Sequence, residues 1–260
     1  MSVAPWHGLR TEWRTGMALT SVADGVFAER HGDGPPAVVA LHGWARRGSD
    51  FDAALTGLDA LAVDLPGFGA SVPPGEPVGA RGYATLLEPV LTALDRPTVL
   101  VGHSFGGRVA VVLAARLPIA GLLLTGVPLV RIGTQRRPPI GFRALRWANA
   151  RRIVSDDRME RERRRRGSAD YRAAEGVMRG VLVASVSESY EDELSGVSAP
   201  TRLLWGADDT EVPPEVAHRA ATLLGSGDVA VDVLEGVGHF LPLEAPAALR
   251  SVIDRMLGAS

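Results

Sequence analysis

The chain has 260 residues and a mass of 27.4 kDa, enough for one large domain or two small ones, and 46% of its residues are hydrophobic. That proportion is too high for a disordered protein. The 28 basic and 30 acidic side chains nearly cancel, so no global field favours nucleic acid or an anionic membrane as a partner. Cysteine is absent, which excludes disulfides and cysteine-ligated metal sites.

No targeting or membrane segment is expected. The first twenty residues are interrupted by charged and aromatic side chains and contain no apolar core of the length that a signal peptide needs. Elsewhere the longest apolar runs have about ten residues, roughly half of the length that is needed to span a membrane. We therefore expect a cytoplasmic protein that does not act at a membrane.

Short apolar runs bounded by Gly and Pro alternate with longer helical patterns, which is typical of a mostly parallel sheet with crossover helices. An antiparallel edge strand is predicted first, at residues 25–31, before a turn rich in Gly and Pro. Buried strands are then predicted at 37–41, 60–64, 98–101, 121–126, 201–205 and 229–234. Helices are predicted at 81–94, 105–116, 214–224 and 246–256. The fold class is therefore α/β, with a mostly parallel, doubly wound sheet.

One stretch, residues 128–198, breaks this alternation and contains no convincing buried strand. Within it, residues 128–180 hold 15 Arg against 6 Asp and Glu, a balance of +9, while the rest of the chain has 13 basic and 24 acidic residues, a balance of −11. We predict that residues 128–198 form a helical lid inserted between two strands. Residues 1–127 and 199–260 would form the core domain.

The chemistry is expected around Ser104. The sequence Gly102-His103-Ser104-Phe105-Gly106-Gly107 follows a predicted strand and opens a predicted helix, which is the context of a nucleophile elbow. The flanking glycines let the backbone and the helix approach without a Cβ clash. The serine hydroxyl would lie at the carboxyl edge of the sheet, beside a helix N-terminus that favours developing negative charge.

Three further segments with polar residues each follow a predicted strand. Leu41-His42-Gly43-Trp44 follows the first buried strand, where the free N–H of Trp44 could join that of Phe105 in holding an oxyanion. The segments that follow the last two strands supply acids, Asp208 and Asp209, and then His239. Because ligands bind at the carboxyl ends of parallel strands, these groups are expected to meet at one edge.

These motifs resemble the α/β-hydrolase superfamily in its serine-hydrolase branch. The resemblance covers roughly residues 37–127 and 201–256 and includes the chain order Ser, Asp, His that this family uses. It implies that Ser104 is the nucleophile, His239 the general base and Asp209 the acid that orients it.

The resemblance also decides between the two neighbouring acids and supplies the oxyanion hole. Similar proteins place the acid four positions before a proline, here Pro213, which favours Asp209 over Asp208. The amides of Trp44 and Phe105 would form the oxyanion hole.

Several neighbouring polar residues are given structural roles. His42 and His103 flank the site, and in the family such histidines brace loops. Asp64 and Ser71 are expected to fix the turn around Gly67 through hydrogen bonds between side chain and backbone.

Arg108, one helical turn after Ser104, has two interpretations. It could brace its helix through an internal ion pair. It could instead bind a substrate carboxylate, because a guanidinium offers bidentate geometry.

The combined prediction is an esterase-like serine hydrolase that forms an acyl-serine intermediate on a small-molecule substrate, either anionic or attached to a carrier. No metal and no organic cofactor is required. Carbon–carbon bond hydrolysis, thioester hydrolysis or a lyase step on the same triad remains an alternative. A receptor or regulator built on the hydrolase fold is an alternative of another class.

Overall fold

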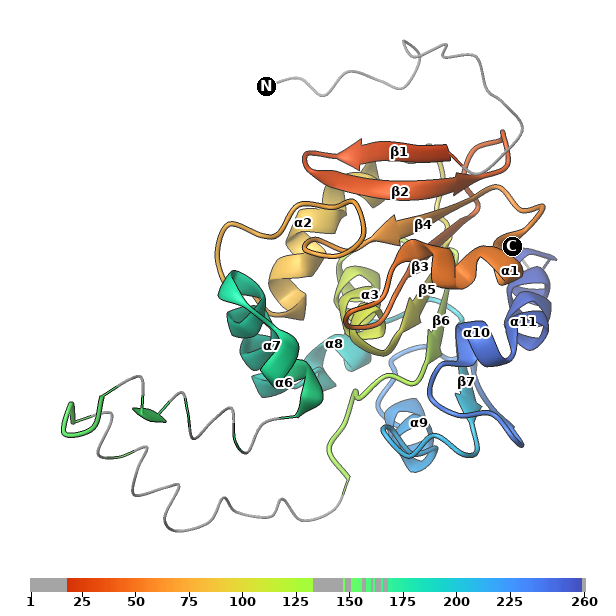
Figure 1. Ribbon diagram of the computed structural model, residues 1–260. Coiled ribbons are helices and arrows are strands. Elements are labelled where there is room, and N and C mark those ends of the chain that lie inside the picture. The colour runs from red at the N-terminus through yellow and green to blue at the C-terminus, as the bar shows by residue number, and fades with distance from the viewer. Residues whose placement is uncertain are drawn as a thin grey trace.

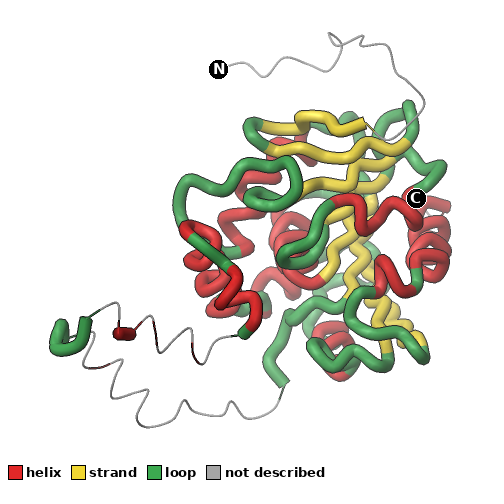
Figure 2. Tube along the Cα trace, viewed as in Figure 1, coloured by secondary structure: helices red, strands yellow, loops and turns green. Residues whose placement is uncertain are grey.

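An eight-stranded sheet runs through the protein, with helices on both of its faces (Figures 1 and 2). The computed structural model describes residues 18–132 and 168–258 and, between them, residues 147, 151–155, 158, 159, 161 and 165. Among the helices in these ranges, none is long and apolar enough to cross a membrane.

The sheet is mostly parallel. In spatial order its strands are β1 (Ala18–Ala23), β2 (Val26–His31), β4 (Ala60–Asp64), β3 (Val38–Leu41), β5 (Val99–His103), β6 (Gly121–Thr125), β7 (Thr201–Gly206) and β8 (Val229–Leu234). Only β1 with β2 and β2 with β4 pair antiparallel; the pairs from β4 to β8 are parallel. The predicted α/β fold class is confirmed.

The prediction of an edge strand at residues 25–31 was wrong in one respect. β2 is antiparallel, but it lies between β1 and β4, and β1 forms the edge of the sheet. β1 escaped prediction because Val22 is its only fully buried residue, so its hydrophobic pattern is weak. The two strands meet in a tight turn at Gly25, whose φ of +67° suits glycine.

Alternate residues of the central strands pack into two separate layers of the hydrophobic core, one on each face of the sheet. Leu100 and Leu122 pack with α2 (Ala80–Thr92) and α3 (Ser104–Arg116), whereas Val99 and Val101 pack with α1 (Asp52–Leu55) and α11 (Pro246–Gly258). Strands covered on both faces have no polar face, which explains their continuous apolar runs in the sequence.

The four predicted helices are present, with boundaries that shift by a few residues. They are α2, α3, α9 (Glu215–Ala221) and α11. Three short helices were not predicted: η2 (Gly48–Phe51), α1 and α10 (Leu241–Glu244). Each has only four residues, too few for a helical period to show in the sequence.

The segment between β6 and β7 contains α6 (Ala169–Ala173), α7 (Gly176–Ser187) and α8 (Glu191–Gly196). Val181, Tyr190 and Leu194 are buried in the same core layer as α2 and α3. Most of residues 133–167 lie outside the described ranges, so the separate lid at 128–198 stays a prediction. Residues 161–166 are rich in arginine. Only Arg161 and Arg165 among them lie in the described ranges, and both are exposed.

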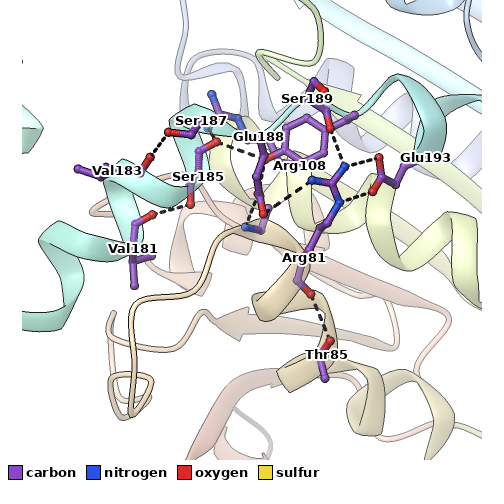
Figure 3. A network of polar contacts seen from close by, with 12 residues as sticks. Arg81, Thr85, Arg108, Val181, Val183, Ser185, Ser187, Glu188, Ser189 and Glu193 are labelled. Carbon is purple, nitrogen blue, oxygen red and sulfur yellow. Dashed lines mark hydrogen bonds and ion pairs between the residues drawn. The ribbon is translucent and has the colours of Figure 1, made fainter.

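Polar contacts hold α7 and α8 to α2 (Figure 3). Arg81 on α2 donates two hydrogen bonds to Glu193, at 2.5 and 2.9 Å, and one to the carbonyl oxygen of Ser189 at 2.7 Å. The Glu188 carboxylate accepts the Ala80 N–H at 2.8 Å, at the start of α2. This part of the inserted segment is therefore fastened to the core.

Candidate active site

The strand order reverses at β3, so a crevice of the kind that binds ligands in open α/β sheets is expected at the carboxyl ends of β3 and β5. After β3 the chain forms β4 on one side, and it then returns to form β5 on the other side of β3. Helices and loops diverge at such a reversal and leave room for a ligand. Trp44 follows β3 and Ser104 follows β5, so both line this point of the sheet.

Ser104 lies at the junction of β5 and α3 in a strained backbone conformation. Its φ is +49°, one of three positive values at non-glycine residues in the described part of the chain. The turn requires close backbone approach: a Cβ on Gly102 would lie 2.5 Å from the Gly107 Cα, and one on Gly106 would lie 2.3 Å from the Leu41 carbonyl oxygen. This is the geometry of a nucleophile elbow.

His239 and Asp209 form a buried pair. The His239 Nδ1 lies 2.9 Å from the Asp209 Oδ2, and the two residues are 9% and 3% exposed. The other Asp209 oxygen accepts the N–H groups of Glu211 and Val212 at 3.0 and 2.8 Å, which fixes the carboxylate. Asp208 is exposed, so the structure pairs His239 with the acid that the spacing to Pro213 selected.

The pKa of His239 is raised above its usual value. Burial acts to lower this pKa, but the hydrogen bond to Asp209 and the charges of Asp209, Glu211 and Glu244 outweigh it. The Glu211 Oε2 lies 3.6 Å from the His239 Nε2, the ring nitrogen that Asp209 leaves free. The sequence interpretation missed Glu211, and the only available signal was its position two residues after Asp209.

The loop that carries Trp44 lies beside Ser104, and Phe105 follows the serine in the chain. A Cβ on Gly43 would lie 3.4 Å from the Ser104 Cβ, so the loop after β3 is in contact with the elbow. The Trp44 and Phe105 rings are 5.6 Å apart in an edge-to-face arrangement. Within the described ranges the Trp44 N–H donates no backbone hydrogen bond, and the Phe105 N–H lies in the first turn of α3, where amides have no acceptor within their own helix.

His42 and His103 brace loops, as predicted. His42 donates from Nδ1 to the Gly43 carbonyl oxygen at 2.7 Å and accepts the Leu65 N–H at Nε2, while His103 Nδ1 donates to the Thr125 carbonyl oxygen at 3.1 Å. Burial lowers the pKa of His42 to about 4 and that of His103 to about 3. Both rings are therefore neutral at pH 7.

Asp64 and Ser71 hold the turn after β4, also as predicted. Asp64 accepts the N–H groups of Gly48 and Ala70, each at 2.8 Å, and the Ser71 hydroxyl donates to the Asp64 carbonyl oxygen at 2.5 Å.

Arg108 contacts the inserted segment and makes no internal ion pair among the described residues. Its Nη1 donates to the Ser185 carbonyl oxygen on α7 at 3.0 Å, and its buried Nε has no hydrogen-bond partner there (Figure 3). Burial lowers the pKa of Arg108, while the nearby Tyr190 and Glu188 oppose that effect.

Two other features lie away from this edge. A surface hollow is found at the opposite, amino edge of the sheet, where it is lined by Pro97, Ile119, Ala120, Pro200, Arg202, Asp228, Val252, Arg255 and Met256. A group of side chains able to hold a metal ion is formed by Glu29, His31 and Asp52, outside the crevice.

Comparison with known proteins identifies the family of the chain. The chain is 26% identical to a 2-hydroxy-6-oxononadienedioate/2-hydroxy-6-oxononatrienedioate hydrolase of Cupriavidus pinatubonensis, over 95% of this chain and 92% of that protein. It is also 26% identical to the monoglyceride lipase of Homo sapiens, over 78% and 73%. The solved structure of an esterase from Mycobacterium tuberculosis, 21% identical, matches with a TM-score of 0.65 over 95% and 92%. A family model described as the alpha/beta hydrolase family matches residues 38–252, most of the chain, and the protein therefore belongs to that family.

Proposed function

We propose that this alpha/beta hydrolase is a serine esterase that cleaves a carboxylic ester, or a related acyl bond, of a small molecule. The observation that carries the proposal is the strained Ser104 at the end of β5, on the same edge as a buried His239–Asp209 pair. A strained non-glycine residue persists only where the surrounding structure holds it, and such strain is concentrated at functional sites.

The proposed reaction has two halves. His239 Nε2 accepts the Ser104 proton while Oγ attacks the acyl carbonyl, and the Trp44 and Phe105 amides stabilise the oxyanion. The C–O bond to the alcohol then breaks, and His239 donates the proton to the leaving oxygen. Water, deprotonated by His239, hydrolyses the acyl-serine in the second half and restores the hydroxyl.

Within the described residues, no hydrogen bond joins Ser104 to His239. This is compatible with the mechanism, because catalytic hydrogen bonds in free enzymes are often long and shorten only in the complex with substrate. When Nε2 is protonated, the imidazolium pairs with the Glu211 carboxylate, whose Oε2 lies 3.6 Å away.

A fluorophosphonate label combined with a chain-length series of chromogenic esters and thioesters tests the proposal. Wild type should be labelled once and should hydrolyse members of the series, whereas Ser104→Ala should lose labelling and several orders of magnitude in kcat/KM. Ser251→Ala, an exposed serine on α11, is the matched control and should behave as wild type. Retention of more than a few per cent of activity in Ser104→Ala would exclude the covalent mechanism.

Hydrolysis of a carbon–carbon bond is the second candidate, favoured by the extent of similarity to the Cupriavidus pinatubonensis enzyme. The same triad would serve, with a carbanion equivalent as the leaving group. Incubation with 2-hydroxy-6-oxononadienedioate and identification of the products by mass spectrometry separates this candidate from an esterase. A ligand that binds tightly, with no turnover in either assay, would indicate a receptor.

A further inference from the structure

Three side chains outside the crevice meet between β2 and α1. Glu29 and His31 lie two positions apart on β2 and therefore point to the same face of the sheet, and Asp52 is the first residue of α1. Each offers one ligand atom, and the three atoms all lie within 4.8 Å of one another. The residues belong to segments more than 20 positions apart, so only the fold brings them together.

All three side chains have a buried polar atom that lacks a hydrogen bond. These atoms are Glu29 Oε2, His31 Nε2 and Asp52 Oδ1, and the lack refers to partners within the described ranges. His31 is only 5% exposed, and its Nε2 points at Asp52 Oδ1 over 3.4 Å. A buried polar atom without a partner is costly, so this arrangement calls for a ligand that satisfies all three atoms together.

The neighbouring charged groups do not satisfy them. Asp64 adds negative charge nearby, but both of its carboxylate oxygens already accept backbone N–H groups, from Gly48 and Ala70. The positive charge of Arg47 acts on Glu29, but burial and the negative charges of Asp52 and Asp64 outweigh it. Two carboxylates and an imidazole therefore face one another with only partial compensation from Arg47.

We propose that Glu29, His31 and Asp52 bind a Zn²⁺ ion. One imidazole nitrogen and two carboxylate oxygens are ligands that zinc accepts, and bonds of about 2.0–2.1 Å in tetrahedral geometry separate neighbouring ligand atoms by about 3.3 Å. The distance from His31 Nε2 to Asp52 Oδ1 is 3.4 Å, which is close to this separation. Glu29 and Asp52 are partly exposed, which provides an entry path and room for water as the fourth ligand.

The ion would fasten β2 to the segment that follows the Trp44 loop. Asp52 begins α1 directly after η2, and Gly48 at the start of η2 is itself held by Asp64. Zinc at this point would stabilise the fold and would not take part in the reaction. The proposal is therefore independent of the esterase assignment.

A proton shared between the two carboxyl groups is the competing explanation. Burial, followed by the hydrogen bond and the charge of Asp52, raises the pKa of Glu29 to about 7. Such a pair would satisfy two of the three atoms without any metal, but it would leave His31 Nε2 unpartnered.

Zinc binding is measured on the full chain without a polyhistidine tag, after chelator treatment and desalting. Calorimetric titration should give one equivalent of Zn²⁺ per chain, and the melting temperature should rise by about 5 °C or more at 100 times Kd. Glu29→Gln, His31→Gln and Asp52→Asn should each weaken binding at least about tenfold, in line with the loss of one ligand. Asp33→Asn and His218→Gln alter exposed residues of the same types and should bind as wild type.

X-ray absorption of the zinc-loaded wild type gives a readout that does not depend on how well the variants fold. One imidazole and otherwise oxygen ligands are expected, while two or more imidazoles would overturn the proposal. Undiminished binding in His31→Gln would also overturn it. So would an absence of binding together with a higher melting temperature in Glu29→Gln, the result that a shared proton predicts.

Discussion

Ser104 illustrates how single residues are held in a costly conformation. A left-handed backbone costs a non-glycine residue roughly 1–2 kcal/mol, which the surrounding contacts must offset. Here the Gly106 N–H donates to the His42 carbonyl oxygen at 3.0 Å, and the Phe105 ring packs edge-to-face on Tyr83 and Trp44. The residues around the serine are thus fixed by neighbours from two other segments, the loop after β3 and α2.

Asp209→Asn should cripple ester turnover, whereas Asp208→Asn should not. An amide cannot stabilise the imidazolium and does not fix the tautomer, and an equivalent change in a serine protease lowers kcat about 10⁴-fold. Asp208 is exposed and serves as the matched control. The measurement is kcat for a chromogenic ester at saturating substrate, with circular dichroism to check folding. Greater damage in Asp208→Asn would refute the pairing seen in the structure.

The acid limb of the pH profile, where kcat/KM rises with pH, should depend on Glu211. His239 must be neutral to act as a base, so kcat/KM should rise with pH through a pKa above the usual histidine value. Glu211→Gln removes a negative charge that favours the imidazolium, so this pKa should fall and the limb should move to lower pH. The shift should amount to a few tenths of a unit, because the Glu211 side chain is 63% exposed.

Glu215→Gln is the control for that experiment. Glu215 is exposed on the first turn of α9 and is not among the groups that shift the pKa of His239. Its pH profile should match that of wild type. An unchanged acid limb in Glu211→Gln would show that the carboxylate does not act on the histidine in solution.

At the scale of elements, α3 is a largely buried helix that packs against strands and helices on several sides. Nine of its thirteen residues are buried, because β5 and β6 lie beneath it while α2 and α8 flank it. Its first turn carries the Phe105 amide, and its second turn carries Arg108, which reaches α7 (Figure 3). One helix therefore links the elbow to the inserted segment.

Arg108→Met should loosen α7 more than it changes substrate preference. The substitution leaves the buried Ser185 carbonyl oxygen with only the longer hydrogen bond from the Tyr190 hydroxyl, at 3.4 Å, and should cost about 0.5–1.5 kcal/mol. Hydrogen exchange across residues 181–187 should become faster. Arg116, at the exposed end of α3, has only the Thr85 hydroxyl as a hydrogen-bond partner within the described ranges, so Arg116→Met should have no such effect.

The same pair of variants decides the second interpretation of Arg108. If its guanidinium binds a substrate carboxylate, the ratio of kcat/KM for a carboxylate-bearing ester to that for its neutral analogue should fall at least about tenfold in Arg108→Met, as loss of a charge-assisted hydrogen bond would predict. An unchanged ratio together with faster exchange would leave Arg108 as a brace of α7.

At the scale of the whole molecule, the parallel strands were the most predictable feature. β3, β4, β5 and β6 are buried along their full length, and their apolar runs are followed at the carboxyl edge by His42, Asp64, Gly102 and Thr125, respectively. β1 was missed because one of its faces is open to solvent. The pairing of His239 with Asp209 was implied by the resemblance to serine hydrolases, in which the acid stands four positions before a proline, here Pro213.

The sequence by itself determined the alternation of strands and helices, the elbow around Ser104 and the order of the acid and the histidine. The first two depend on hydrophobic period and turn chemistry within a few neighbouring residues, and the third was implied by the resemblance to a known family. Only the tertiary structure placed Glu211 against His239, tied Arg108 to α7 and gathered Glu29, His31 and Asp52. Those contacts join residues that are distant along the chain, and burial and pairing depend on what the fold places around each group.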